Sequence, residues 1–98
     1  MDAIMLTARD NVATALRDLA SGEMAVVGVM DETRRVAICE PIAFGHKFAV
    51  APVYKGDLIL KYGEVIGRAT RDIPTGGHAH VHNIESLRGR GDLAAAGA

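Results

Sequence analysis

Hydrophobic and polar positions along the 98-residue chain alternate in short stretches that are separated by turn-forming residues. The Val-rich segment 24–30 and the segment 34–39 flank a polar turn and predict a β-hairpin. Further short strands are expected at 3–7, 48–50, 58–60, 65–70 and 78–84. Turn signals recur roughly every 8–12 residues, and no long stretch has helical periodicity. The pattern therefore predicts an all-β domain, a small barrel-like arrangement of short strands.

The segment that begins at Val12 fits two elements. Val12, Leu16 and Leu19 have helical spacing, whereas Val12, Thr14 and Leu16 alternate as in a strand. A strand is favoured, because Ser21-Gly22 ends the segment early and β-branched residues are interspersed.

The composition sets limits on the function. Hydrophobic residues make up 49% of the chain, enough for one core, but aromatic residues only 4%, so we expect no deep aromatic pocket. We assign one domain to residues 1–86 and expect the Gly/Ala/Arg-rich segment 87–98 to be a mobile tail. The formal net charge of −1 argues against nucleic acid as a partner, and no apolar stretch is long enough for a membrane span.

The chain has one cysteine, Cys39, which excludes an intrachain disulfide. Because it follows an apolar run, we expect its side chain to be a small buried hydrophobe. The absence of disulfides and of a secretory signal pattern makes the cytoplasm the expected compartment.

Three histidines follow a Gly-Gly pair, at positions 78, 80 and 82, and Asn83 comes next. In a strand, side chains two residues apart project from the same face. Two such imidazoles can reach one metal ion, and an imidazole also exchanges a proton near neutral pH. The alternative is a solvated strand edge that carries histidines by chance. Because no cysteine ligands accompany them, any metal here would need further ligands, which we expect from another chain.

Two weaker signals accompany the histidines. Gly45, His46 and Lys47 form a cationic bend that could cradle a carboxylate. Lys61 could pair with an acidic substrate, and Tyr62 could donate a hydrogen bond or a proton. At both places, ordinary turn geometry and packing are the alternative and stay open.

These segments also carry a family resemblance. The motifs are Asp10-Asn11-Val12-Ala13, Gly45-His46-Lys47, Lys55-Gly56, Lys61-Tyr62-Gly63-Glu64, Ile66-Gly67, Asp72-Ile73-Pro74 and His80-Val81-His82-Asn83. Together they resemble the N-terminal domain of altronate and galactarate dehydratases. The resemblance implies a SAF domain with the β-clip fold. The small subunit of sulfolactate sulfo-lyase is similar.

The resemblance also implies site residues. His80, His82 and Asn83 match the family's His-x-His-Asn run and are the expected catalytic residues, with His80 and His82 facing a divalent metal ion, iron or manganese. The expected substrate-binding residues are Gly45, His46, Lys47, Lys61 and Tyr62. His78 stands where many members have a bulky apolar or aromatic residue, so the resemblance does not make it a shared catalytic group.

The expected function is that of a small subunit or N-terminal domain of a sugar-acid hydro-lyase. It would cap the active site of a larger catalytic subunit and be inactive without it, with a small sugar acid as substrate. One alternative is the small subunit of a sulfolactate sulfo-lyase. Another is a non-catalytic carbohydrate- or protein-binding SAF module. A homo-oligomer of the isolated chain also stays open.

Overall fold

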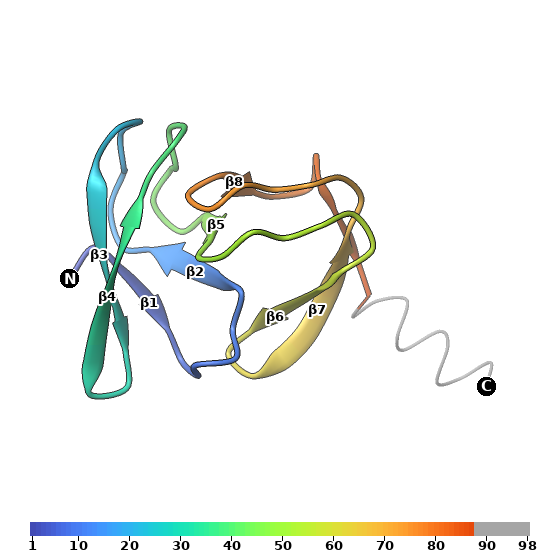
Figure 1. Ribbon diagram of the computed structural model, residues 1–98, viewed down its shortest axis with the longest axis horizontal. Helices are drawn as coiled ribbons and strands as arrows, with labels where there is room; N and C mark the ends of the chain where they lie inside the picture. Colours follow the sequence, from blue (N-terminus) through green and yellow to red (C-terminus); the bar gives the residue numbers. More distant parts are fainter. Residues whose placement is uncertain (88–98) are drawn as a thin grey trace.

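The computed structural model describes residues 1–87, and in this part of the chain it contains strands and turns without a helix (Figure 1). The strands are β1 (Ala3–Met5), β2 (Val12–Ala15), β3 (Met24–Val29), β4 (Glu32–Ala37), β5 (Lys47–Ala49), β6 (Leu58–Lys61), β7 (Glu64–Ala69), β8 (His78–Ala79) and β9 (Ile84–Ser86). The predicted all-β fold is confirmed. Over residues 1–87, no helix offers the length or the apolar surface for a membrane crossing.

Six strands form one sheet in the order β4-β3-β1-β2-β5-β8. The β1–β3 pair is parallel, and the other pairs are antiparallel. Ala25, Val27 and Val29 of β3 are buried in the core at the two-residue period of a strand. Met24 is exposed and Val26 is half-buried, whereas Gly28 is buried as well. Phe48 of β5 is fully buried in the same core. This core therefore extends from the β3–β4 hairpin to β5.

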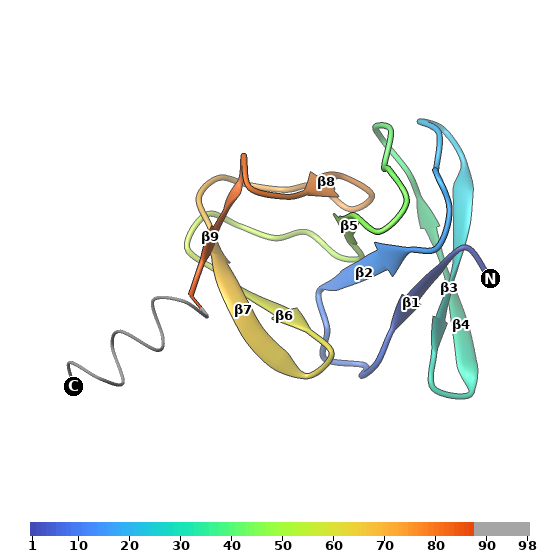
Figure 2. The same cartoon turned by 180° about the vertical axis from the view of Figure 1, so that it is seen from behind.

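The other sheet has the order β6-β7-β9 and is antiparallel. It lies beside β2 and β5 at the end of the molecule away from the β3–β4 hairpin (Figures 1 and 2). A second core fills the space between the two sheets; its buried residues are Val12, Ala49, Val53, Ile59, Ala69, Ile73 and Ala79. Strand β5 thus serves both cores, with Phe48 in one and Ala49 in the other.

The side chain of Asp10 forms hydrogen bonds that connect the two sheets. It is 3% exposed, and its carboxylate accepts hydrogen bonds from the backbone nitrogens of Leu6 and Thr7 in its own turn at 3.0 and 3.3 Å. The same carboxylate accepts bonds from the backbone nitrogens of Tyr62 and Gly63, at 2.9 and 2.8 Å. A buried charge is tolerated only when it is hydrogen-bonded in this way. The β6–β7 turn is therefore fixed against the β1–β2 loop.

The strand predicted over 3–7 ends at Met5, and two other predicted strands were also too long. The strand expected over 78–84 is interrupted, since β8 ends at Ala79 and a turn precedes β9. The strand expected from Val12 is β2, which ends at Ala15, and Leu19 makes an isolated bridge with Ile42. In both places alternating side chains indicated a longer extended segment than the structure contains.

The prediction of a buried Cys39 was wrong, because its side chain is exposed. Its backbone nitrogen donates to the carbonyl of Gly76, so the main chain is engaged while the thiol points outward. The tail predicted over 87–98 lies, apart from Leu87, outside the described residues.

Candidate functional site

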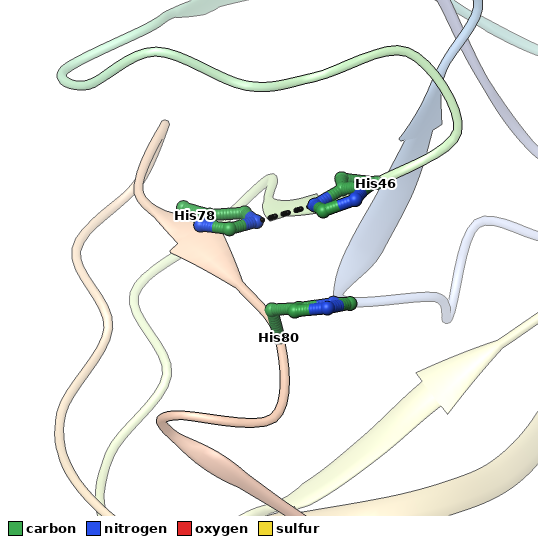
Figure 3. A group of neighbouring side chains, drawn as sticks. All are labelled: His46, His78 and His80. Carbon is green, nitrogen blue, oxygen red and sulfur yellow. Dashed lines mark hydrogen bonds between the residues drawn. The ribbon is translucent and has the colours of Figure 1, made fainter.

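Three imidazole rings meet at one end of the β5–β8 pair (Figure 3). The His46 Nδ1 and His78 Nε2 atoms lie 2.9 Å apart and share a hydrogen bond. The His80 ring stacks on the His46 ring, with 4.3 Å between their centroids and 18° between their planes. One nitrogen from each of the three rings lies within 4.8 Å of the others. We call His46, His78 and His80 the histidine triad.

Strand pairing explains why the triad forms. In the antiparallel register of β5 and β8, Lys47 faces Ala79 and Phe48 faces His78. Continuing this register by one residue places His46 opposite His80, and directly opposed side chains in a sheet are close neighbours. His78 and His80 are two residues apart and share a face of the chain. The triad is therefore a cross-strand group rather than a single-strand row.

Gly76 allows β8 to begin close to the end of β4. Its φ is 82°, and a Cβ atom on it would overlap the carbonyl oxygen of Ala37. Its nitrogen donates to the carbonyl of Ala49, and its carbonyl accepts from the nitrogen of Cys39. Only glycine combines this positive φ with such a close backbone approach. Gly76 therefore sets the position from which His78 and His80 extend.

Asn83 holds the turn that follows the triad. It is 5% exposed, and its side-chain oxygen accepts a hydrogen bond from the nitrogen of His80 at 2.9 Å. Its amide nitrogen donates to the carbonyl of His78 at 2.8 Å. Asparagine side chains commonly stabilise turns in this way. In the structure the Asn83 side chain therefore binds the backbone of His78 and His80. Its catalytic role remains a prediction.

The environment favours the neutral form of two triad members. Burial lowers the pKa of His78, and the nearby His82, His46 and His80 lower it further. Burial likewise lowers the pKa of His80, with His46 and Lys47 adding to the effect. Within the described part of the chain, the buried Nδ1 atom of His80 has no hydrogen-bond partner. A neutral imidazole can accept a proton or bind a metal ion.

A cavity of about 280 Å³ adjoins the triad through His80. Its polar lining is provided by Lys47, Lys61, His80 and Ser86, and its apolar lining by Ile66, Val81 and Ile84. Burial lowers the pKa of Lys47, and the charge of Lys61 lowers it further. Two ammonium groups that repel each other across a small cavity favour an anion between them.

The remaining predicted residues lie around this cavity or outside it. Gly45 has a φ of 82°, and its nitrogen donates to the carbonyl of Ala15, so it forms the turn before His46. The Lys61 ammonium lies 5.1 Å from the centre of the Tyr62 ring, and the Tyr62 hydroxyl is 3.4 Å from Thr14 Oγ1. His82 is exposed, and its ring centroid lies 5.1 Å from that of His78.

Two features of the site were not anticipated. His46 was expected to contact substrate, but its role as the third member of the triad depends on pairing between strands that are 32 residues apart. Asp10 was noted only as part of a motif, and its contacts with Tyr62 and Gly63 span 52 and 53 residues. The sequence signals for Asp10 were its place in that motif and its position among turn-forming residues.

The chain has clear relatives. A family model described as altronate/galactarate dehydratase SAF domain matches residues 1–87. The altronate dehydratase of Escherichia coli (strain K12) is 43% identical over 86 residues, and that of Bacillus subtilis (strain 168) is 40% identical over 84 residues. These matches include 88% and 85% of this chain, but the chain spans only 17% and 16% of the two dehydratases.

A further relative is matched over almost its whole length. The (2R)-sulfolactate sulfo-lyase subunit alpha of Chromohalobacter salexigens is 31% identical over 91 residues, which is 90% of this chain and 97% of that subunit. The family model includes both strands of the triad and every strand of the two sheets. On this evidence the chain belongs to the family of altronate/galactarate dehydratase SAF domains.

Proposed function

We propose that this chain is the SAF component of a sugar-acid hydro-lyase of the altronate/galactarate type. The observation that carries the proposal is the cavity in which Lys47 and Lys61 lie together with His80. In this proposal the domain caps the active site of a larger catalytic part, and neither part is active alone.

The two lysines suit a carboxylate ligand. Lys47 and Lys61 both line the cavity, and the described lining contains no acidic side chain to neutralise them. A hydrogen bond between an ammonium and a carboxylate is stronger than one between neutral groups. We assign Lys47 and Lys61 to the carboxylate of the substrate. Tyr62, whose ring lies next to the Lys61 ammonium, keeps Lys61 in place.

The proposed reaction is the loss of water from a polyhydroxy acid. A proton leaves the carbon next to the carboxylate, and a hydroxyl group leaves the following carbon with a second proton. His80 lines the cavity, and burial holds its pKa below the ordinary value, so it can act as a base. A divalent ion such as iron or manganese would place positive charge near the developing anion and polarise the departing hydroxyl.

The larger part is required because this chain offers little enclosure. The cavity of about 280 Å³ is slightly smaller than a typical small-molecule site, and its lining by residues 1–87 contains no Phe, Tyr or Trp. The altronate dehydratases that this chain resembles are much longer than the region it matches. We therefore propose that the rest of the active site comes from another domain or subunit.

A sulfo-lyase is the second candidate. The match to a sulfolactate sulfo-lyase subunit alpha extends over 97% of that subunit, so in that protein a region of this kind forms a subunit by itself. Sulfolactate also carries a carboxylate, which the same lysine pair would bind. The two candidates differ only in whether hydroxide or sulfite leaves.

Affinity capture from the native organism tests the proposal. The chain would be tagged, and the captured complex would be assayed against a panel of sugar acids and against sulfolactate. We expect a larger partner, and turnover by the complex that neither component shows alone. Release of sulfite in place of water would select the second candidate. A chain that is captured alone and is inactive would contradict both and favour a carbohydrate- or protein-binding module.

Substitutions of His80 and His82 distinguish a catalytic role of these histidines from a role in binding the larger partner. In the active complex, His80→Ala and His82→Ala should each lower kcat while the partner is still captured. If neither substitution changes turnover, the histidines have no catalytic role, although the subunit assignment can survive.

A further inference from the structure

Within residues 1–87, the triad of His46, His78 and His80 is the one group of three or more metal-ligating side chains whose ligand atoms come within 4.8 Å of one another. All three rings are half-buried (Figure 3). His78 lies in β8, His80 directly follows that strand, and His46 directly precedes its partner β5. His82, which the sequence pattern pairs with His80, is exposed and is not part of this group.

The triad contains an uncompensated polar atom. The Nδ1 atom of His80 is buried without a hydrogen-bond partner among residues 1–87. A buried polar atom without a partner is destabilising, and its presence in a folded protein needs a reason. A ligand that bonds to ring nitrogens would provide one. The other two rings, those of His46 and His78, share a hydrogen bond with each other.

We propose that His46, His78 and His80 form a three-imidazole binding site for a divalent first-row transition metal ion. Only the use of the ion in catalysis rests on the proposed function. In this inference the ligands beside His80 are His46 and His78, and His82 is not a ligand. Binding of the ion by this chain alone can be measured without any catalytic partner.

Small movements of the three imidazole rings would allow one nitrogen of each ring to bind the same metal ion. Two imidazole nitrogens on one tetrahedral ion lie about 3.3 Å apart when each bond is about 2.0 Å long. His46 Nδ1 and His78 Nε2 are 2.9 Å apart, so they need to separate by only a few tenths of an ångström. The hydrogen that they share moves to the other nitrogen of its own ring, and both rings stay neutral. The stacked His80 ring must turn to direct a nitrogen toward the same point.

The donor set selects the class of ion. Three imidazoles suit zinc, iron, cobalt, nickel or copper, whereas magnesium and calcium prefer oxygen ligands. The nearby Glu40 carboxylate is bonded to the backbone nitrogen of His78 at 3.0 Å and is not among the grouped ligands. Metal sites with three protein ligands keep a position for water or substrate. His80 belongs both to the triad and to the cavity wall, so the ion would lie beside the cavity.

Metal titration of the purified, metal-free chain tests the inference. Zinc binding would be measured by calorimetry, and cobalt binding by visible absorption, whose intensity reports the coordination geometry. We expect one ion per chain, with no heat from magnesium. His46→Ala, His78→Ala and His80→Ala should each weaken zinc binding by more than about 100-fold, since loss of an outer-shell partner alone costs about 10–100-fold. His82→Ala is the matched control and should retain the affinity.

Two outcomes would overturn the inference. One is that the folded wild-type chain binds neither zinc nor cobalt. The other is that His82→Ala abolishes binding while His46→Ala retains it. Circular dichroism of each variant shows whether it is folded, and His46→Gln replaces His46→Ala if the latter is not. Turnover by the complex after capture is a separate measurement, so a failed metal titration leaves the proposed function standing, and an inactive complex leaves the metal site standing.

Discussion

The carboxylate of Asp10 lies 2.8 Å from the backbone nitrogen of Gly63, which is 53 residues away in the sequence. Through this bond and the neighbouring one to Tyr62, a buried acid in the β1–β2 loop positions the turn after Lys61. Tyr62 has a φ of 55°, which is unusual for a residue with a side chain, and the bond to Asp10 helps to hold it there. The position of Lys61 at the cavity therefore depends on an acid that does not line it.

Replacing Asp10 by alanine should destabilise the fold strongly. Asp10→Ala removes the acceptor from four backbone nitrogens, and hydrogen bonds to a charged group contribute about 1.5–3 kcal/mol each. We expect the free energy of unfolding in urea to fall by about 3 kcal/mol or more. Asp57→Ala is the control, because this exposed carboxylate accepts from the nitrogen of Tyr54; its cost should stay below about 1 kcal/mol. Equal costs for the two variants would contradict the role of Asp10.

The stability that Asp10 contributes should also depend on pH. Burial raises the pKa of Asp10, but hydrogen bonds from Gly63, Leu6 and Thr7 outweigh it and hold the pKa below the ordinary value of 3.8. The folded state therefore favours the ionised form more than the unfolded state does. The contribution is fully present above the unfolded pKa and is lost as the pH falls through the folded pKa.

Unfolding of the wild type and of Asp10→Asn, compared at about pH 7 and at successively lower pH, checks this dependence. The difference in unfolding free energy should be constant down to about pH 5 and then shrink. The backbone nitrogen of Val26 donates to Asp2 and the Arg17 guanidinium donates to Glu23, and these bonds hold the pKa values of the two carboxylates below their ordinary values. Both acids are present in both proteins, so their effects cancel. A difference that is constant over the whole range would contradict the prediction.

Asn83 should act by positioning His80. Asn83→Ala leaves the nitrogen of His80 and the carbonyl of His78 without partners, which should lower the unfolding free energy by about 2 kcal/mol. Asn83→Asp keeps the acceptor and loses the donor, so its cost should be smaller. In the active complex, a positioning role predicts that Asn83→Asp recovers part of the kcat that Asn83→Ala loses. If both variants are equally inactive yet as stable as the wild type, Asn83 is a catalytic residue.

Lys47 and Lys61 should determine how tightly the active complex binds the carboxylate of its substrate. In the active complex, Lys61→Met should raise KM by about tenfold or more, because a charged hydrogen bond contributes about 1.5–3 kcal/mol and 1.4 kcal/mol corresponds to tenfold. Lys47→Met should have a similar effect. Lys55→Met is the control, since Lys55 is exposed in a turn and does not line the cavity. An unchanged KM in both lysine variants would place the carboxylate elsewhere.

Part of the structure was accessible from the sequence. Alternation of Val-rich and polar positions correctly predicted the β3–β4 hairpin, and the turn residues at Lys55 and Gly63 correctly separated later strands. The strand expected over 78–84 failed because the Asn83 side chain bonds to the backbone of His78 and His80 and folds the chain into a turn. An alternating pattern cannot reveal such a bond, since the same residues suit an extended strand.

The all-β class, the short strands and the types of side chain available for chemistry follow from the amino-acid sequence alone, because period, turn residues and family motifs are local properties. The tertiary structure alone decided that β5 pairs with β8, and therefore that His46 stands opposite His80. It also decided that Lys61 reaches the cavity of Lys47, through Asp10 and the turn at Gly63. Pairing between distant strands is set by which apolar faces pack into the shared core, and no local pattern specifies that choice.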